Sequence, residues 1–267
     1  MTQQLDQRYV FGDLLRDWRR SRNVTQMALA NKAEISPRHL SFVENGRSTP
    51  SRSLVIRLAG HLEVPLRGRN QLLLAAGFAP EYSKQELDGP RLSMVRMAIS
   101  KVLTGHDPYP ALVVDHSWNL VEANASASLL IAELPADLLA EPCNMLRISL
   151  HPRGLAPRIL NLEEWTEHVL DRLRRQMRIS GDRELVKLHA ELTGYTGNRA
   201  PRQDAPSRNP VAGDVIVPMR LQHGEHVLSL FSTVTTFGTP RDITVEELAI
   251  EAFYPADEET SELLRSL

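Results

Sequence analysis

The sequence predicts an α+β protein of two domains, a small helical domain followed by a larger domain of antiparallel strands and helices. Apolar residues recur at helical spacing in the first part of the chain, whereas short strand-like runs appear only later. Charge divides the chain at the same place. Residues 1–77 hold 12 Lys and Arg against 6 Asp and Glu, a net charge of +6, and the rest holds 19 against 27, a net charge of −8. We therefore expect domains at residues 1–78 and 107–267, with a linker and connecting helix at residues 79–106.

Composition excludes several classes of protein. With 267 residues, 42% of them hydrophobic, the chain is long enough to pack two domains. No apolar run approaches the length of a membrane span, and the N-terminus lacks the apolar core of a signal peptide, so we expect a cytoplasmic protein. Cys143 is the single cysteine, which excludes an internal disulfide and a thiolate metal cluster.

Apolar residues at helical spacing predict the helices of the first domain. Phe11, Leu15 and Trp18 give the first helix one buried face. A fourth helix is predicted from Leu54 to Leu62 and a fifth over residues 67–77. The second and third helices, which lie between them, carry the chemistry.

Two helix caps with a tight turn between them define the motif at this place. Thr25 and Ser36 are both N-cap residues, because a hydroxyl can accept a hydrogen bond from a free amide of the first turn. Pro37 suits the first helical position, where its missing N–H costs nothing. Only Glu34 and Ile35 separate the second cap from the preceding helix. A turn this short makes the second helix cross the first, which is a helix-turn-helix.

The second helix of the motif exposes side chains that suit DNA. Leu40 and Val43 face inward, so the remaining side chains point elsewhere. An arginine can bond guanine O6 and N7 together, and an aromatic edge can contact a thymine methyl group. Gly46 supplies a left-handed C-cap, and the arginines and hydroxyls after it suit phosphate oxygens. The base-reading candidates are Arg38, His39, Ser41 and Phe42. The other candidate DNA contacts are Thr25, Ser36, Asn45, Arg47 and Arg52.

Residues 8–80 resemble the lambda-repressor-like, or XRE-type, helix-turn-helix domain, which has five helices. The run from Val43 to Arg47 matches the family's hydrophobic-Glu-x-Gly-Arg pattern. The resemblance implies that Gln26 contacts a phosphate and that Glu44 has a structural role, tying down the loop. Phe42 departs from the polar residue that is usual at its position. An ordinary small helical bundle is the alternative.

The second domain is predicted to open with a hairpin, after a linker and a helix from about Arg91 to Leu103. Its strands, residues 111–115 and 120–123, are joined by a four-residue turn and followed by Asn124 and a helix over residues 125–133. This looks like the opening of a PAS domain, where a strand ending in Asp pairs with one ending in Asn before the first helix.

Further elements are predicted downstream. Residues 162–193 have helical spacing, and residues 215–221 and 227–236 flank a turn at Gly224, which favours a second hairpin. Residues 244–250 are predicted to form one more helix or turn.

A second resemblance covers residues 107–260, which are similar to the ligand-binding domain of MmyB-like transcription regulators. That domain is a PAS-like sensor joined to an XRE-type head in bacterial regulators. The runs 144–152 and 248–257 and the pair Glu164-Trp165 carry the similarity, and the family's His-Pro-x-x-Gly signature appears in altered form at residues 209–213. The resemblance implies a fatty-acid-like ligand for some members, held between the sheet and the helices.

Three residues are candidates for contacting such a ligand. A PAS-like sheet covered by helices can enclose an apolar cavity with a few polar groups at its mouth. Arg147, in a strand-like run with Leu146 and Ile148, is the candidate cation for a carboxylate, with a solvated surface arginine as the alternative. Asn124 could bond the ligand or cap the helix after it. Trp165 could line the pocket or belong to the core.

Other chemistries fit the sequence less well. The histidines are scattered, no nucleophile or carboxylate pair is recognisable, and glycine-rich phosphate loops are absent. His223 and His226 lie three apart across a predicted turn, which we expect to place them on different faces, with no third ligand nearby. We therefore expect no enzyme activity, no cofactor and no metal site.

Together these features predict a DNA-binding transcription regulator, a repressor, that binds palindromic operator DNA as a homodimer. Its second domain is expected to dimerise and to bind a small-molecule effector, with a fatty acid or acyl compound as one candidate. A regulator whose second domain only dimerises is the first alternative. An antitoxin-like module, which binds another protein through its acidic domain, is the second.

Overall fold

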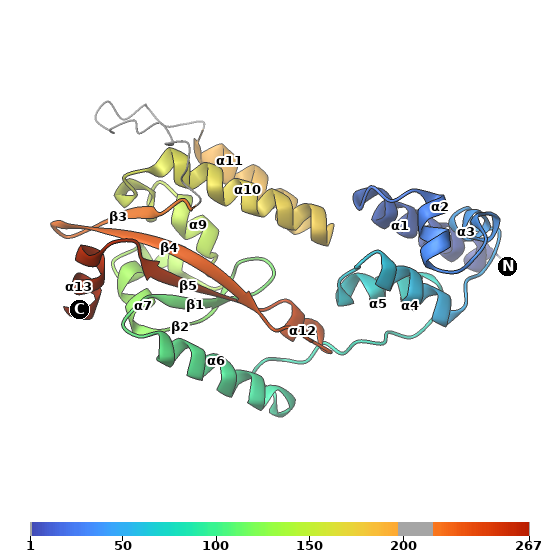
Figure 1. Ribbon diagram of the computed structural model, residues 1–267, viewed down its shortest axis with the longest axis horizontal. Coiled ribbons are helices and arrows are strands. Elements are labelled where there is room, and N and C mark those ends of the chain that lie inside the picture. Colours follow the sequence, from blue (N-terminus) through green and yellow to red (C-terminus); the bar gives the residue numbers. More distant parts are fainter. Residues whose placement is uncertain (1, 197–215, 267) are drawn as a thin grey trace. The chain divides into compact units, whose positions relative to one another are not determined.

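The structure, a computed structural model, describes residues 2–196 and 216–266 and divides the chain into two units (Figure 1). The head unit comprises residues 1–85, 178–181 and 239–246, and the sheet unit comprises residues 86–177, 182–238 and 247–267. The predicted class, a helical head followed by an antiparallel sheet with helices, is confirmed. No helix among the described residues is long and apolar enough to cross a membrane.

The head unit contains the five predicted helices. They are α1 (Thr2–Ser21), α2 (Gln26–Lys32), α3 (Pro37–Glu44), α4 (Arg52–His61) and α5 (Leu66–Ala75). Thr25 caps α2 by accepting a hydrogen bond from the N–H of Ala28 at 3.1 Å, and Ser36 caps α3 by accepting one from His39 at 3.1 Å. Phe11, Leu40 and other side chains from all five helices fill one core.

A short segment far along the chain also belongs to the head unit. It holds α12 (Ile243–Glu246) and, before this helix, the buried Asp242. The Asp242 carboxylate accepts hydrogen bonds from the Ser83 hydroxyl at 2.6 Å and from the Gln85 N–H at 3.1 Å. The helix or turn predicted over residues 244–250 is thus a helix only at its start.

Five antiparallel strands form the sheet. They are β1 (Ala111–Val114), β2 (Leu120–Ala123), β3 (Met219–His223), β4 (His226–Thr236) and β5 (Ala249–Pro255), in the order β2-β1-β5-β4-β3. The central strand, β5, begins inside the predicted helix or turn over residues 244–250, and the sequence pattern assigned no structure to the rest of it. Side chains alternate along it, so Ile250 faces one core while Ala249 and Phe253 face the other.

Helices cover both faces of the sheet, with α6 on one face and α10 and α11 on the other (Figure 1). The helical elements are η1 (Pro90–Leu92), α6 (Ser93–His106), α7 (Ala125–Ile131), α8 (Ala136–Leu139), α9 (Met145–Leu150), η2 (Ala156–Arg158), α10 (Leu162–Ser180), α11 (Arg183–Thr196) and α13 (Glu258–Ser266).

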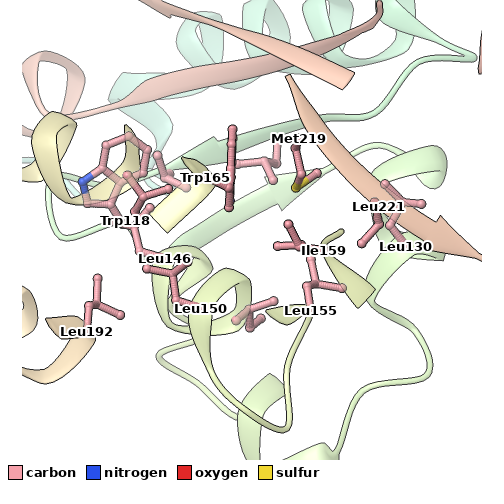
Figure 2. Close-up of a cluster of buried hydrophobic side chains, with 14 of the residues drawn as sticks. Trp118, Leu130, Leu146, Leu150, Leu155, Ile159, Trp165, Leu192, Met219 and Leu221 are labelled. Atoms are coloured by element: carbon pink, nitrogen blue, oxygen red, sulfur yellow. The ribbon is translucent and has the colours of Figure 1, made fainter. Parts of the chain in front are cut away.

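The larger core lies between the sheet and helices α9 to α11. Figure 2 shows Trp118 and Trp165 close to Leu146 and Leu150 of α9, with Leu221 of β3 in the same cluster. All five side chains are buried. This apolar layer lies between sheet and helices, where the family resemblance implies a ligand for some members.

Three predicted elements differ from the structure. The helix over residues 162–193 is two helices, because Gly181 adopts a φ of +66° that ends α10. The strand-like run around Arg147 is the helix α9, which Asn144 caps by accepting a hydrogen bond from the Arg147 N–H at 3.0 Å. The second hairpin begins at Met219. The altered signature at residues 209–213 lies outside the described residues.

Candidate nucleic-acid interface and ligand site

The recognition helix α3 is held by one face and presents the other. Leu40 and Val43 are fully buried, whereas Arg38 is exposed and the candidates His39, Ser41 and Phe42 are half-buried. The guanidinium carbon of Arg38 lies 5.3 Å from the centre of the Phe42 ring. Two of the predicted base-reading side chains therefore contact each other.

Glu44, at the end of α3, joins three helices. Only 2% of this residue is exposed, and its carboxylate accepts hydrogen bonds from Arg19 Nε at 2.7 Å and Nη2 at 3.0 Å. The same carboxylate accepts a bond from Gln26 Nε2 at 2.9 Å. The bond from Arg19 to Glu44 is the main reason why the pKa of Arg19 is raised. Glu44 thus has a structural role, but its carboxylate holds Arg19 of α1 and Gln26 of α2 rather than the loop that the resemblance implied.

Gln26 is held by this bond in a defined orientation. An amide nitrogen carries two N–H groups, and Glu44 accepts a hydrogen bond from one of them. The second N–H is therefore the group that could donate to a phosphate. Thr25 and Ser36 already use their hydroxyl oxygens as helix caps, which leaves the hydroxyl hydrogens for a phosphate.

Arg47, in the loop after α3, and Arg52, at the start of α4, are not equally available to a phosphate. Arg47 is exposed, and its N–H donates to the carbonyl of Phe42 at 2.8 Å, after Gly46 has turned the chain with a φ of +67°. Arg52 instead forms an ion pair with Glu81. A phosphate would have to compete for Arg52 with the Glu81 carboxylate, which lies 29 residues further along the chain.

Asn45 ends α3 and bridges two elements. Its Nδ2 donates to Ser41 Oγ at 3.3 Å, and its Oδ1 accepts from Arg16 Nη2 at 3.2 Å. The side chain is exposed, so it is positioned at the surface by these two bonds. Ser41 is positioned with it.

Asn124, the first ligand candidate, is a helix cap. Its Oδ1 accepts hydrogen bonds from the N–H of Ala127 at 3.0 Å and of Ala111 at 2.9 Å. Its Nδ2 donates to Asp107 at 2.9 Å and to the Tyr109 carbonyl at 2.8 Å. A side-chain amide has two acceptor and two donor positions, and all four are used. Of the two alternatives, the structure shows the cap, and no capacity is left for a ligand.

Arg147, the candidate cation, is already paired. Its Nε and Nη2 donate to the two carboxylate oxygens of Glu191 at 2.6 and 2.8 Å. This bond raises the pKa of Arg147 and lowers that of Glu191. Tyr195 also donates to Glu191, and burial together with this bond raises the pKa of Tyr195 to about 12. An acidic ligand at Arg147 would have to replace Glu191.

Trp165 belongs to the core. Only 3% of the residue is exposed, and its Nε1 donates to Ser149 Oγ at 2.9 Å. His168 stacks on it with ring centres 5.3 Å apart, and burial lowers the pKa of this histidine, which favours the neutral ring. Trp165 is therefore part of the apolar layer shown in Figure 2.

A second charged group under α10 was not predicted. Arg172 donates to Glu251 of β5 at 2.6 Å, and its guanidinium carbon lies 4.3 Å from the centre of the Trp118 ring. Ser232 donates to the same carboxylate at 3.0 Å. Glu251 is 4% exposed, and Arg172 Nε is buried without a hydrogen-bond partner among the described residues. An acidic residue inside an apolar strand pattern is the signal that could have revealed this pair.

The expected geometry of the two turn histidines is wrong. His223 and His226 are direct partners in the hairpin of β3 and β4. Cross-strand partners project to the same face, so the two rings share a face rather than lying on opposite ones. Within residues 2–196 and 216–266, no group of three or more His, Cys, Asp or Glu side chains is placed to hold a metal ion.

Comparison with known proteins identifies both parts of the chain. Residues 95–267 match the family described as the MmyB-like transcription regulator ligand binding domain, and residues 10–72 match a helix-turn-helix domain. No curated protein matches significantly. One similar solved structure is titled as an RNA-binding light-oxygen-voltage receptor, with 13% sequence identity and a TM-score of 0.27. That match covers 93% of this chain and spans 62% of the other chain's length.

Proposed function

The chain belongs to the family of the MmyB-like transcription regulator ligand binding domain, and from this premise we propose that it represses transcription by binding palindromic operator DNA as an XRE-type homodimer. Its sheet unit takes a small amphiphilic effector that alters operator affinity, and it catalyses no reaction. We place this regulator in the bacterial cytoplasm. A helix-turn-helix domain joined to a ligand-binding domain is the architecture of a transcription regulator.

Support for operator binding comes chiefly from the exposed Arg38 on a recognition helix whose opposite face is fully buried. The N-terminal turn of such a helix meets base edges in the major groove. Residues 1–77 have a net charge of +6, which suits a polyanion, and residues 78–267 have a net charge of −8, which does not. The base-reading surface is therefore assigned to α3.

Support for an amphiphilic effector comes from the apolar layer between the sheet and helices α9 to α11. Two arginines border this layer, and each is paired with a carboxylate, Arg147 with Glu191 and Arg172 with Glu251. An acidic head group that replaced one of these carboxylates would meet a ready bidentate partner. An apolar tail would add about 0.8 kcal/mol for each methylene that it buries.

Operator binding is tested by selecting DNA from a random pool with the full chain. The proposal requires one recurring palindrome whose enrichment falls as salt rises. Recovery of sequences without a common motif would overturn it.

Effector binding is tested by calorimetry on delipidated protein with saturated fatty acids of increasing length and the matching alcohols. Affinity should rise with length until the layer is full, and Arg147→Ala should weaken the acids far more than the alcohols. Equal affinity across the lengths would remove the amphiphile. A length dependence that Arg147→Ala leaves unchanged would remove only the role of Arg147, and Arg172→Ala would then be compared in the same way.

A further inference from the structure

We infer that Phe42 determines specificity by positioning Arg38, so that the ring holds the guanidinium toward the base edge and does not itself read a base. This inference rests on the proposed operator binding. It changes the role of Phe42 from a candidate base contact to a positioning residue.

The two side chains are placed for this contact by helix geometry. Arg38 lies in the first turn of α3 and Phe42 lies four residues later, so they are neighbours on one face of the helix. The guanidinium carbon is 5.3 Å from the ring centre, within the range in which the negative face of an aromatic ring attracts a cation. Arg38 is the exposed partner and Phe42 the half-buried one.

The backbone of Phe42 is anchored. Its carbonyl accepts hydrogen bonds from the N–H of Arg47 at 2.8 Å and of Ser48 at 3.2 Å, so the loop after the helix is anchored on this residue. The neighbouring Val43 is fully buried. Neither the backbone nor the helix face at Phe42 can shift without moving the loop.

Arg38 has no competing carboxylate among the described residues. Arg16, Arg19 and Arg52 of the head unit each form an ion pair with an acidic side chain, whereas Arg38 forms none in this part of the chain. Its long side chain would otherwise sample many rotamers, and a bidentate contact with guanine needs one orientation of the planar group. The ring restricts this freedom before DNA is bound.

The Phe42 ring cannot support Arg38 and read a base with the same face. The ring face that the Arg38 guanidinium covers is not free to contact a base.

The test measures binding of the full chain to the selected operator and to variants with each base changed in one half-site. Phe42→Leu removes the π face and keeps an apolar side chain, while Phe42→Tyr keeps the face. Phe42→Leu should lower discrimination by about threefold at the base position that Arg38→Ala affects. A loss of this size is expected when an exposed cation–π contact is removed. Phe42→Tyr should retain the discrimination. The double variant, with Arg38→Ala and Phe42→Leu together, should discriminate no less than Arg38→Ala alone.

Two results of these titrations would overturn the inference. Loss of discrimination at another base position in Phe42→Leu would show a direct base contact, and additive effects in the double variant would show independent roles. If the unchanged protein shows no base preference, operator binding itself fails and the inference fails with it. If Phe42→Leu does not fold, NMR of the unchanged free protein decides, because Arg38 side-chain protons without a ring-current shift would exclude the contact.

Discussion

Glu44 shows how one buried carboxylate fixes the geometry of a DNA-binding surface. Its charge lies in the interior, where an unpaired carboxylate would be costly, and Arg19 and Gln26 satisfy it. Each of these partners comes from a different helix of the head unit. The carboxylate therefore helps to set the orientation of α3 against α1 and α2.

Replacing this carboxylate should destabilise the head unit. Glu44→Ala leaves the half-buried Arg19 without its carboxylate partner, which should cost about 3 kcal/mol of the free energy of unfolding. Hydrogen exchange of the α2 and α3 amides in the full chain measures this loss. Asp17→Ala, which removes an exposed carboxylate of α1, is the matched control and should change protection by less than about 0.5 kcal/mol. Equal effects of the two changes would refute the structural role of Glu44.

Arg38 and Arg47 should differ in what they contribute to DNA binding. Arg38→Ala should cost about 1–3 kcal/mol at one base position of each half-site, because a bidentate guanine contact is lost. Arg47→Ala should weaken binding to all sequences alike and reduce the salt slope by roughly one unit. Titrations over variant operators and salt concentrations separate the two roles. Uniform weakening by Arg38→Ala would contradict the base-reading assignment.

Roles that depend on neighbouring residues were readable from the sequence, and roles that depend on distant partners were not. Thr25, Ser36 and Asn124 cap helices that begin at the next residue, so the hydroxyl or amide and the free amide are close in the chain. Arg147 looked like an available cation because its partner, Glu191, lies 44 residues away. Only the fold brings these two charges together.

At the scale of elements, the crossing of α1 and α3 depends on a residue without a side chain. A Cβ added at Gly12 would lie 2.2 Å from the carbonyl oxygen of Glu44, far inside the contact distance. Glycine is an unfavourable residue inside a helix, so its place here reflects the close approach of the two helices. This approach allows Arg16 and Arg19 to reach the end of α3.

Two glycine substitutions should therefore have opposite effects. Gly60→Ala, in α4 with nothing within 4 Å of the new Cβ, should raise the free energy of unfolding by about 0.5–1 kcal/mol through helix propensity. Gly12→Ala should lower it by more than this gain, because backbone atoms must move apart. Urea denaturation of the full chain measures both. A stabilising Gly12→Ala would show that the helices can separate without cost.

The elements that sequence patterns missed are those with mixed polarity. Strand β5 places Glu251 in the interior between Ile250 and Ala252, which obscures the alternation of a half-buried strand. Helix α9 is only six residues long, too short for its spacing to outweigh the strand-like run of apolar residues around Arg147. By contrast, α2 and α3 carry N-caps, the other helices of the head unit carry apolar residues at helical spacing, and the first hairpin has a turn, and these signals predict them.

For the whole molecule, the central question is how an effector could change operator affinity. A ligand shifts binding only if it favours one arrangement of the two units over another. The coupling is reciprocal, so operator DNA must change effector affinity by the same factor. Since the sheet unit is acidic and the head unit basic, the sheet unit is the better candidate for dimer contacts away from DNA.

Dimerisation should be visible in the operator. One recognition helix reads only a few base pairs, so useful affinity requires two heads, and a two-fold dimer selects half-sites about 10 base pairs apart or a multiple of that. Hydroxyl-radical footprinting of the full chain should therefore show protection with dyad symmetry, and sedimentation should show two chains for each operator. The chain carrying Arg38→Ala should lose protection in both halves together, because each half-site meets the same helix. Protection without a dyad, or one chain for each operator, would leave the head unit acting alone and would remove the reason for assigning a dimer interface to the sheet unit.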